Sequence, residues 1–97
     1  MKWQVVVTDT AKALLLDLSK SDQQIVFKRL QKLSFEPEIQ GKPLAKELSG
    51  YRRVRTGRLK IIFRTDPKTA TVYVVALGLR KAGDKADVYE KARKVIK

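Results

Sequence analysis

The stretch that decides the fold is Tyr51-Arg52-Arg53-Val54-Arg55-Thr56-Gly57-Arg58-Leu59-Lys60-Ile61-Ile62-Phe63-Arg64, residues 51–64. Basic and apolar residues alternate through much of it with a period of two, which is typical of β-strands. Thr56-Gly57 suits a two-residue turn. The stretch therefore predicts a hairpin of two strands, 51–55 and 58–64.

This turn would place the basic side chains of the hairpin on one face. Arg55 would lie opposite Arg58, and Arg53 opposite Lys60, because directly opposed residues share a face. That face carries Tyr51, Arg53, Arg55, Arg58, Lys60, Ile62 and Arg64, whereas the other carries Val54, Leu59, Ile61 and Phe63, with Arg52 at its margin. Like charges side by side cost stability unless an anion binds. The pattern predicts a phosphate-binding surface, and the alternative is a solvated face of extended arginines.

Residues outside the hairpin predict an α+β fold of order β-α-α-β-β-β-α. Residues 3–7 form a strand, and apolar residues at helical spacing give two helices, the second opened by a capping box from Ser21 to Gln24. The inward residues of the helices are Ala11, Leu14, Leu15 and Leu18, then Val26, Phe27, Leu30 and Leu33. Residues 36–50 form a loop, 71–77 a strand buried on both faces, and Asp87-Val88-Tyr89-Glu90 opens a last helix with Val88, Ala92, Val95 and Ile96 inward. We expect the helix hairpin to pack on a small, mainly antiparallel sheet.

Composition narrows the class of protein. The chain has 97 residues with 22 Lys+Arg against 10 Asp+Glu, a net charge of +12, and it contains no cysteine or histidine. Residues 41–64 hold eight basic residues and only Glu47 as an acid. These features exclude disulfides, thiolate chemistry and histidine catalysis. We expect one domain over residues 1–97, soluble and cytoplasmic, without membrane association, whose partners are polyanions.

Several segments together resemble the RelE/ParE superfamily of bacterial toxins, and its RelE branch in particular. They are Gly41-Lys42-Pro43-Leu44, then Leu48-Ser49-Gly50-Tyr51-Arg52-Arg53-Val54-Arg55-Thr56-Gly57, Lys60-Ile61-Ile62-Phe63, Ala76-Leu77-Gly78-Leu79-Arg80 and Asp87-Val88-Tyr89. The resemblance implies the toxin of a type II toxin–antitoxin pair with a RelE-like fold. It implies a metal-independent endoribonuclease without cofactor that cleaves mRNA in the ribosomal A site by attack of a 2′-hydroxyl. Its partners would be an acidic antitoxin and the ribosome.

The family's catalytic positions fall on Arg53, Arg55, Lys60, Arg80 and Tyr89. RelE proteins often have lysine at the first two positions and arginine at the third. Arginine stays protonated in proteins, whereas lysine can lose its proton among crowded cations. We therefore expect Arg53, Arg55 and Arg80 to hold phosphate charge, and Lys60 or Tyr89 to act near the 2′-hydroxyl. Tyr89 could equally cap the core. Further RNA contacts are expected from Tyr51, Arg52, Arg58, Arg64 and Lys81.

Two other functions fit the same residues. A ParE-like toxin would inhibit DNA gyrase by protein binding, although a basic residue at each expected position and Tyr89 favour the nuclease. A non-catalytic RNA-binding domain would stack bases on exposed aromatic side chains. Asp87 and Glu90 are interpreted as helix-capping residues and not as metal ligands.

Overall fold

The computed structural model describes residues 2–79 and 88–95. Its elements are β1 (Gln4–Val7), α1 (Asp9–Leu16), α2 (Lys20–Lys32), β2 (Lys42–Pro43), β3 (Arg52–Thr56), β4 (Leu59–Asp66), β5 (Thr71–Leu79) and α3 (Val88–Val95). The strands form one sheet in the order β1-β5-β4-β3-β2, in which only β1 and β5 pair in parallel. The expected α+β fold with a mainly antiparallel sheet is confirmed. The short β2 lies within the segment predicted as a loop.

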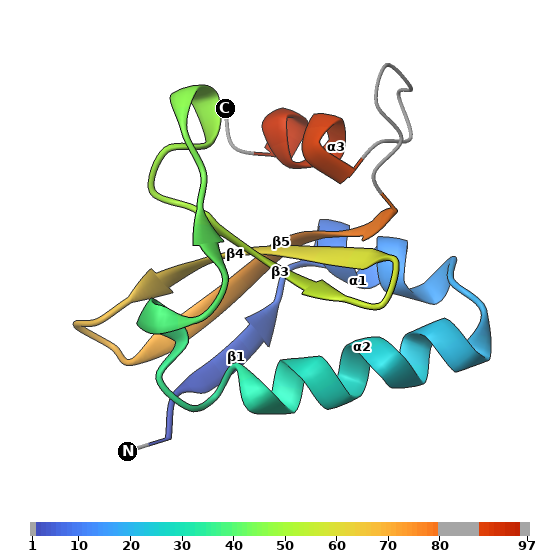
Figure 1. Cartoon of the computed structure of the whole chain (residues 1–97), viewed down its shortest axis with the longest axis horizontal. Coiled ribbons are helices and arrows are strands. Elements are labelled where there is room, and N and C mark those ends of the chain that lie inside the picture. The colour runs from blue at the N-terminus through green and yellow to red at the C-terminus, as the bar shows by residue number, and fades with distance from the viewer. Residues whose placement is uncertain (1, 80–87, 96–97) are drawn as a thin grey trace.

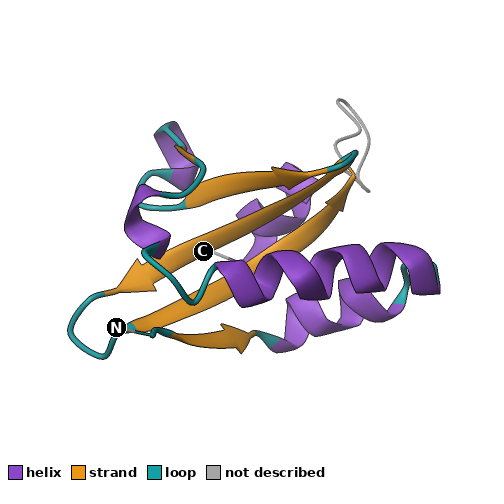
Figure 2. Ribbon diagram, turned by 60° about the horizontal axis from the view of Figure 1, so that its bottom comes forward, coloured by secondary structure: helices purple, strands orange, loops and turns teal. Residues whose placement is uncertain are grey.

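The helices cover the two faces of the sheet (Figure 1). On one face, α1 packs along β5 and α2 contacts β3, and α3 packs on β4 and β5 from the other face. The long central hairpin of β4 and β5 lies between these layers (Figure 2). None of the described helices is long and apolar enough to cross a membrane. Because helices cover both faces of the sheet, each basic side chain of β3 and β4 lies either on the α3 face or on the face of α1 and α2.

The register of the β3–β4 hairpin differs by two residues from the predicted one. Thr56 pairs with Leu59, so the turn is Gly57-Arg58 and not Thr56-Gly57. Gly57 has φ +61°, as the first turn residue of a type II′ hairpin requires. Arg55 now lies opposite Lys60, and Arg53 opposite Ile62. A shift of two residues leaves the side chains that remain paired on their predicted faces, and it moves Arg58 into the turn.

A β-bulge in β5 gives each face its own core. Ile62 pairs with Ala76 and Phe63 with Val74, which leaves Val75 as an extra residue on β5. Val75 and Ala76 therefore both face α3, where they pack with Ile62. The other core contains Ala11, Leu15, Val26, Leu30, Leu33, Val54, Leu59, Ile61, Phe63, Val72, Val74 and Leu77. The prediction that residues 71–77 supply buried side chains to both faces is confirmed.

Two details of the helices differ from the predictions. The cap of α2 is Ser19, whose hydroxyl accepts a hydrogen bond from the Asp22 amide at 3.2 Å, so the predicted capping box at Ser21 is wrong. Phe27 is 50% exposed and not inward. The buried stripe of α2 is Val26 and Leu30, and Phe27 lies about 100° around the helix from Val26. The Asp87 capping pattern and Ile96 lie outside the described residues.

Gly41 allows the loop before β2 to approach β3 closely. Its φ is +71°, and a Cβ there would lie 2.2 Å from the Arg53 carbonyl oxygen, whereas a Cβ on Gly57 would meet no atom of the described residues within 4 Å.

We predict that Gly57→Ala costs about 1 kcal/mol of unfolding free energy, the strain of an L-residue at positive φ. Gly41→Ala should cost about 2 kcal/mol more, because it adds a steric clash. Urea unfolding of both variants tests this, and equal losses would contradict it.

Candidate nucleic-acid interface

A row of basic side chains lies on the α3 face of the sheet. Arg53, Arg55 and Lys60 share the face of Ile62, which packs beneath α3. Lys60 lies between Arg55 on β3 and Gly78 on β5. Arg55 is exposed and Lys60 is half-buried. Among the described residues, no atom lies within 4 Å of a Cβ placed on Gly78, so none of them covers the sheet surface beside Lys60. We call Arg53, Arg55 and Lys60 the basic row.

Arg53 is held against α3 by Tyr89. The Arg53 Nη1 donates a hydrogen bond to the Tyr89 hydroxyl at 3.3 Å. Tyr89 is only 7% exposed, because its ring belongs to the core formed with Val88 and Ala92. The Nε of Arg53 is buried and has no hydrogen-bond partner within the described residues. The structure thus positions a half-buried guanidinium whose donors are incompletely satisfied, which favours binding of an anion.

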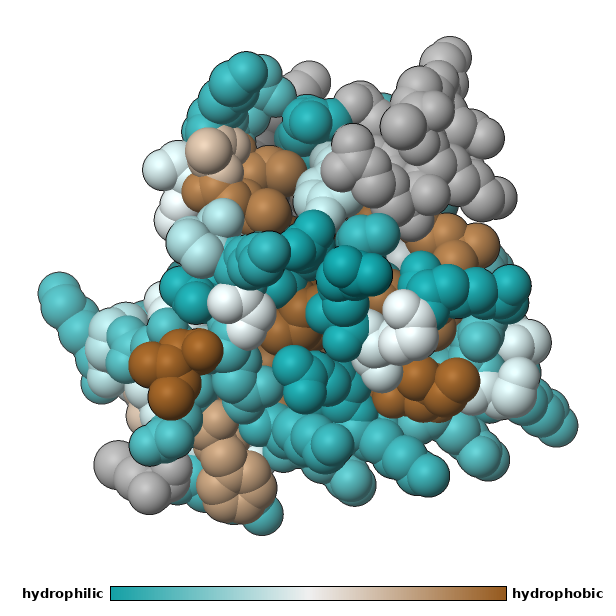
Figure 3. All heavy atoms as spheres, viewed as in Figure 1, coloured by the Kyte–Doolittle hydropathy of each residue, from teal (hydrophilic) through white to brown (hydrophobic). Residues whose placement is uncertain are grey.

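Among the described residues, no carboxylate forms an ion pair with the basic row. In residues 2–79 and 88–95 the ion pairs are Arg58 with Asp22 at 3.2 Å and Arg93 with Glu47 at 3.0 Å. Neither pair involves the basic row. In the view of Figure 3, hydrophilic side chains gather across the middle of the molecule, over β3. Unpaired cations grouped on a sheet are the arrangement expected for a phosphate-binding surface.

Two arginines predicted to contact RNA are directed elsewhere. Arg58 occupies the hairpin turn and pairs with Asp22 in the first turn of α2, so the prediction that it shares the face of the basic row is wrong. Arg52 lies on the opposite face, where its Nε donates to the Gln40 carbonyl at 2.8 Å and its Nη2 to the Gly41 carbonyl at 3.1 Å. Arg52 therefore holds the loop before β2.

Of the remaining predicted site residues, Tyr51 and Arg64 lie in the part of the chain that the structure describes, and Arg80 and Lys81 do not. Tyr51, which was expected to contact RNA, is half-buried against the core beneath α3. Arg64 shares the face of the basic row but lies further along β4, where its guanidinium carbon is 4.2 Å from the centre of the Tyr73 ring. No sequence motif indicates a role for Tyr73, although its position opposite Arg64 follows once the bulge is known. Arg80 and Lys81 lie outside the described residues.

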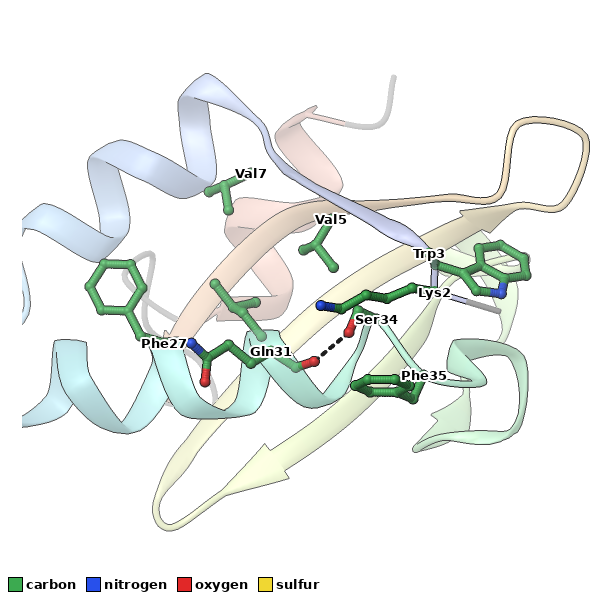
Figure 4. A pocket seen from close by; sticks show the side chains of 9 residues that line it. Lys2, Trp3, Val5, Val7, Phe27, Gln31, Ser34 and Phe35 are labelled. Carbon is green, nitrogen blue, oxygen red and sulfur yellow. Dashed lines mark hydrogen bonds between the residues drawn. The ribbon is translucent and has the colours of Figure 1, made fainter.

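A second surface, which the sequence analysis missed, is an apolar groove between β1 and α2. It encloses about 700 Å³ and is lined by Lys2, Trp3, Val5, Val7, Phe27, Leu30, Gln31, Ser34 and Phe35. Figure 4 shows Trp3 and Phe35 at one end of this groove and Phe27 at the other. Phe35 is 57% exposed. Large exposed aromatic side chains grouped in this way mark an interaction surface.

The hydrogen bond between Arg53 and Tyr89 should be measurable as an energetic coupling. We predict that the unfolding free energies of wild type, Arg53→Met, Tyr89→Phe and the double variant give a coupling of about 1 kcal/mol. Arg55→Met in place of Arg53→Met is the matched control, since Arg55 is exposed, and it should show no coupling with Tyr89→Phe. Equal coupling for both arginines would contradict the described contact.

No protein-family model and no curated protein sequence matches this chain. Solved structures do match. The chain is 31% identical to a chain of the toxin–antitoxin complex RelBE2 from Mycobacterium tuberculosis, with 82% of this chain and 93% of that chain covered and a TM-score of 0.78. A double mutant of the E. coli toxin RelE in the free state matches at 17% identity, 97% coverage of both chains and a TM-score of 0.77. The archaeal RelE–RelB complex from Pyrococcus horikoshii contains a chain matched at 18% identity, with 86% of this chain and all of that chain covered and a TM-score of 0.67.

The first of these similarities extends over nearly the whole length of the matched chain at an identity above 30%. The E. coli and archaeal structures match at lower identity, and they support the fold alone. The resemblance stated from the sequence is thereby confirmed. This chain belongs to the RelE family of toxins from toxin–antitoxin systems.

Proposed function

We propose that this toxin is a ribosome-dependent endoribonuclease that cleaves mRNA in the A site without a metal ion. The observation that carries the proposal is the basic row, in which Lys60 lies between Arg55 on β3 and Gly78 on β5. A phosphodiester placed over this row would meet three cations from two strands. Such a substrate would be encountered in the cytoplasm, where translation takes place.

Cleavage by an internal nucleophile makes three demands on the site. The 2′-hydroxyl must lose a proton, the extra negative charge on phosphorus must be stabilised, and the 5′-oxygen must be protonated as it leaves. The 2′-oxygen then forms a bond to phosphorus while the bond from phosphorus to the 5′-oxygen breaks. The products are a 2′,3′-cyclic phosphate and a 5′-hydroxyl. The residues of the basic row can remove the proton and stabilise the charge without histidine, and water can supply the proton for the 5′-oxygen.

We assign proton removal to Lys60. It is half-buried, lies beside Gly78, and is the one amine of the basic row, whose other two members carry guanidinium groups. Arg55 and Arg53 hold the phosphate and stabilise the charge that develops on its oxygens. The 5′-oxygen leaves with a hydrogen bond from one of these guanidinium groups and takes its proton from water.

Of the two roles expected for Tyr89, action near the 2′-hydroxyl and capping of the core, its burial supports the second. At 7% exposure it has little surface with which to contact a substrate, and its hydroxyl accepts the hydrogen bond from Arg53. We therefore propose that Tyr89 is a positioning residue, which fixes the guanidinium of Arg53 for contact with phosphate. Lys60, not Tyr89, then acts on the 2′-hydroxyl.

Tyr89→Phe should consequently raise the mRNA concentration needed for half-maximal cleavage more than it lowers the maximal rate.

Replacing Lys60 tests the nuclease assignment. Lys60→Met should lower the single-turnover rate of mRNA cleavage on programmed ribosomes by a factor of about 10²–10³, the usual effect of losing a catalytic polar group. The matched control is Arg58→Met, which removes one charge from the same hairpin but outside the basic row. It should cleave at a rate within about threefold of wild type. A Lys60→Met protein that remains folded and cleaves as fast as Arg58→Met would contradict the assignment.

The partner that we propose for the groove between β1 and α2 is the cognate antitoxin. Several of the matched structures are complexes of a RelE toxin with its antitoxin, including the archaeal RelE–RelB complex. The groove is apolar, and β1 is an outer strand of the sheet, so a partner segment can lie beside it. An acidic antitoxin also complements the net charge of +12. Apolar antitoxin side chains would fill the space between Trp3, Phe27 and Phe35.

A charge placed in the groove should weaken this complex selectively. We predict that Phe27→Glu raises the dissociation constant for the antitoxin at least tenfold, because a carboxylate would be desolvated among apolar side chains. Gln24→Glu adds the same charge at an exposed position of α2 outside the groove and serves as the control. Cleavage of ribosome-bound mRNA by both variants should match wild type. Equal antitoxin affinity of Phe27→Glu and Gln24→Glu would contradict this assignment.

A further inference from the structure

We propose that Arg64 and Tyr73 form a second phosphate-binding subsite, which holds the RNA backbone at a distance from the basic row. The proposal rests on the proposed nuclease function, since it concerns the same RNA strand. Arg64 on β4 and Tyr73 on β5 are directly paired. Both side chains are half-exposed. They lie on the face of the sheet that also carries the basic row.

The Tyr73 ring contacts the flat face of the Arg64 guanidinium and leaves the N–H donors along its edge available for a ligand. The guanidinium carbon lies 4.2 Å from the centre of the Tyr73 ring, which is a cation–π contact. This contact uses the face of the planar group, whereas phosphate binds through the N–H donors along its edge. Stacking on the ring also restricts the side chain before a ligand arrives, so less conformational entropy is lost on binding. Tyr73 is therefore a positioning residue for Arg64.

No carboxylate in residues 2–79 or 88–95 forms an ion pair with Arg64. The acid nearest along the same face of β4 is Asp66, whose Oδ1 accepts a hydrogen bond from the Lys68 amide at 3.1 Å in the following turn. Tyr51 continues the register of β3 to the position opposite Arg64. The guanidinium is thus flanked by two tyrosine positions on neighbouring strands and has no acidic partner there. This environment suits an external anion.

The spacing on β4 determines what kind of ligand the subsite can share with the basic row. Arg64 is four residues from Lys60, which corresponds to about 13 Å along a strand. One phosphate cannot contact both side chains. Ile62, between them on β4, is fully buried beneath the α3-side core, but Arg53 lies opposite it on β3. Because α3 covers Ile62, a strand of several nucleotides would run from Arg55 to Arg64 along β3, beside the half-buried Arg53.

An acidic segment of a protein is the other occupant with suitable charge. RNA is favoured because Arg53 lies between the basic row's other members and Arg64. Successive phosphates of one RNA strand could therefore contact these cations in turn. The antitoxin is assigned to the groove between β1 and α2, which lies on the opposite face of the sheet. Binding of a short RNA and of the antitoxin can be measured separately, so the two occupants are distinguishable.

The experiment compares RNAs of two lengths. Single-stranded 2′-O-methyl oligonucleotides cannot be cleaved by a 2′-hydroxyl attack, so they report binding alone. We predict that Arg64→Gln weakens binding of a hexanucleotide about five- to tenfold, measured by fluorescence anisotropy. For Arg64→Gln, the slope of log affinity against log salt concentration should be smaller in magnitude than for wild type by about 0.7. This is the value for one phosphate contact of a single strand. Binding of a dinucleotide, measured by NMR titration, should not change, because a dinucleotide cannot span both sites.

Variants of Tyr73 test the positioning role. Tyr73→Leu should weaken hexanucleotide binding by at least threefold, whereas Tyr73→Phe retains the aromatic face and should bind like wild type. Arg64→Gln with unchanged hexanucleotide affinity and salt slope would overturn the proposal, as would an effect of this variant on antitoxin affinity alone. Folded Tyr73→Leu that binds like wild type would overturn the role of the ring. A wild-type protein that binds the hexanucleotide as predicted but cleaves no ribosome-bound mRNA would refute the nuclease function while leaving the subsite standing.

Discussion

The pairing of β3 with β4 is the constraint on which the rest of the structure depends. The two-residue turn at Gly57-Arg58 fixes a register in which Val54, Ile61 and Phe63 are buried beneath α1 and α2. Each fully buried side chain of this size contributes about 1.5–3 kcal/mol. A slip of one residue would expose them and bury the cations instead. The apolar face therefore holds the basic row in place on the opposite face, although the cations repel one another.

The side of the sheet that carries the basic row is also the side that α3 covers. The bulge at Val75 directs two successive residues of β5 toward α3, and this helix supplies Tyr89 to the guanidinium of Arg53. Helix packing and the placement of a phosphate-binding group are thus parts of one arrangement. The other layer, formed by α1 and α2, leaves the apolar groove beside β1. RNA and antitoxin are consequently assigned to different faces of one sheet.

Much of this arrangement could be predicted from the sequence, because side-chain alternation has a period of two. The predicted turn was displaced, yet Arg53 and Lys60 share a face as expected, since an even shift preserves it. The same shift moved Arg58 into the turn, where Asp22 is within reach. Contacts between distant segments were not predictable: neither the hydrogen bond from Arg53 to Tyr89 nor the stacking of Arg64 on Tyr73 follows from local pattern. The exposure of Phe27 depends on the angle at which α2 packs.

The central claim is that the cations of the basic row cleave RNA and do not merely bind a protein partner. The most direct measurement is to incubate the purified wild-type toxin with programmed ribosomes and to map the ends of the mRNA chemically. We predict breaks confined to the A-site codon, with a 2′,3′-cyclic phosphate on one fragment and a 5′-hydroxyl on the other. Intact mRNA, together with inhibition of DNA gyrase in a supercoiling assay by the same preparation, would contradict the account.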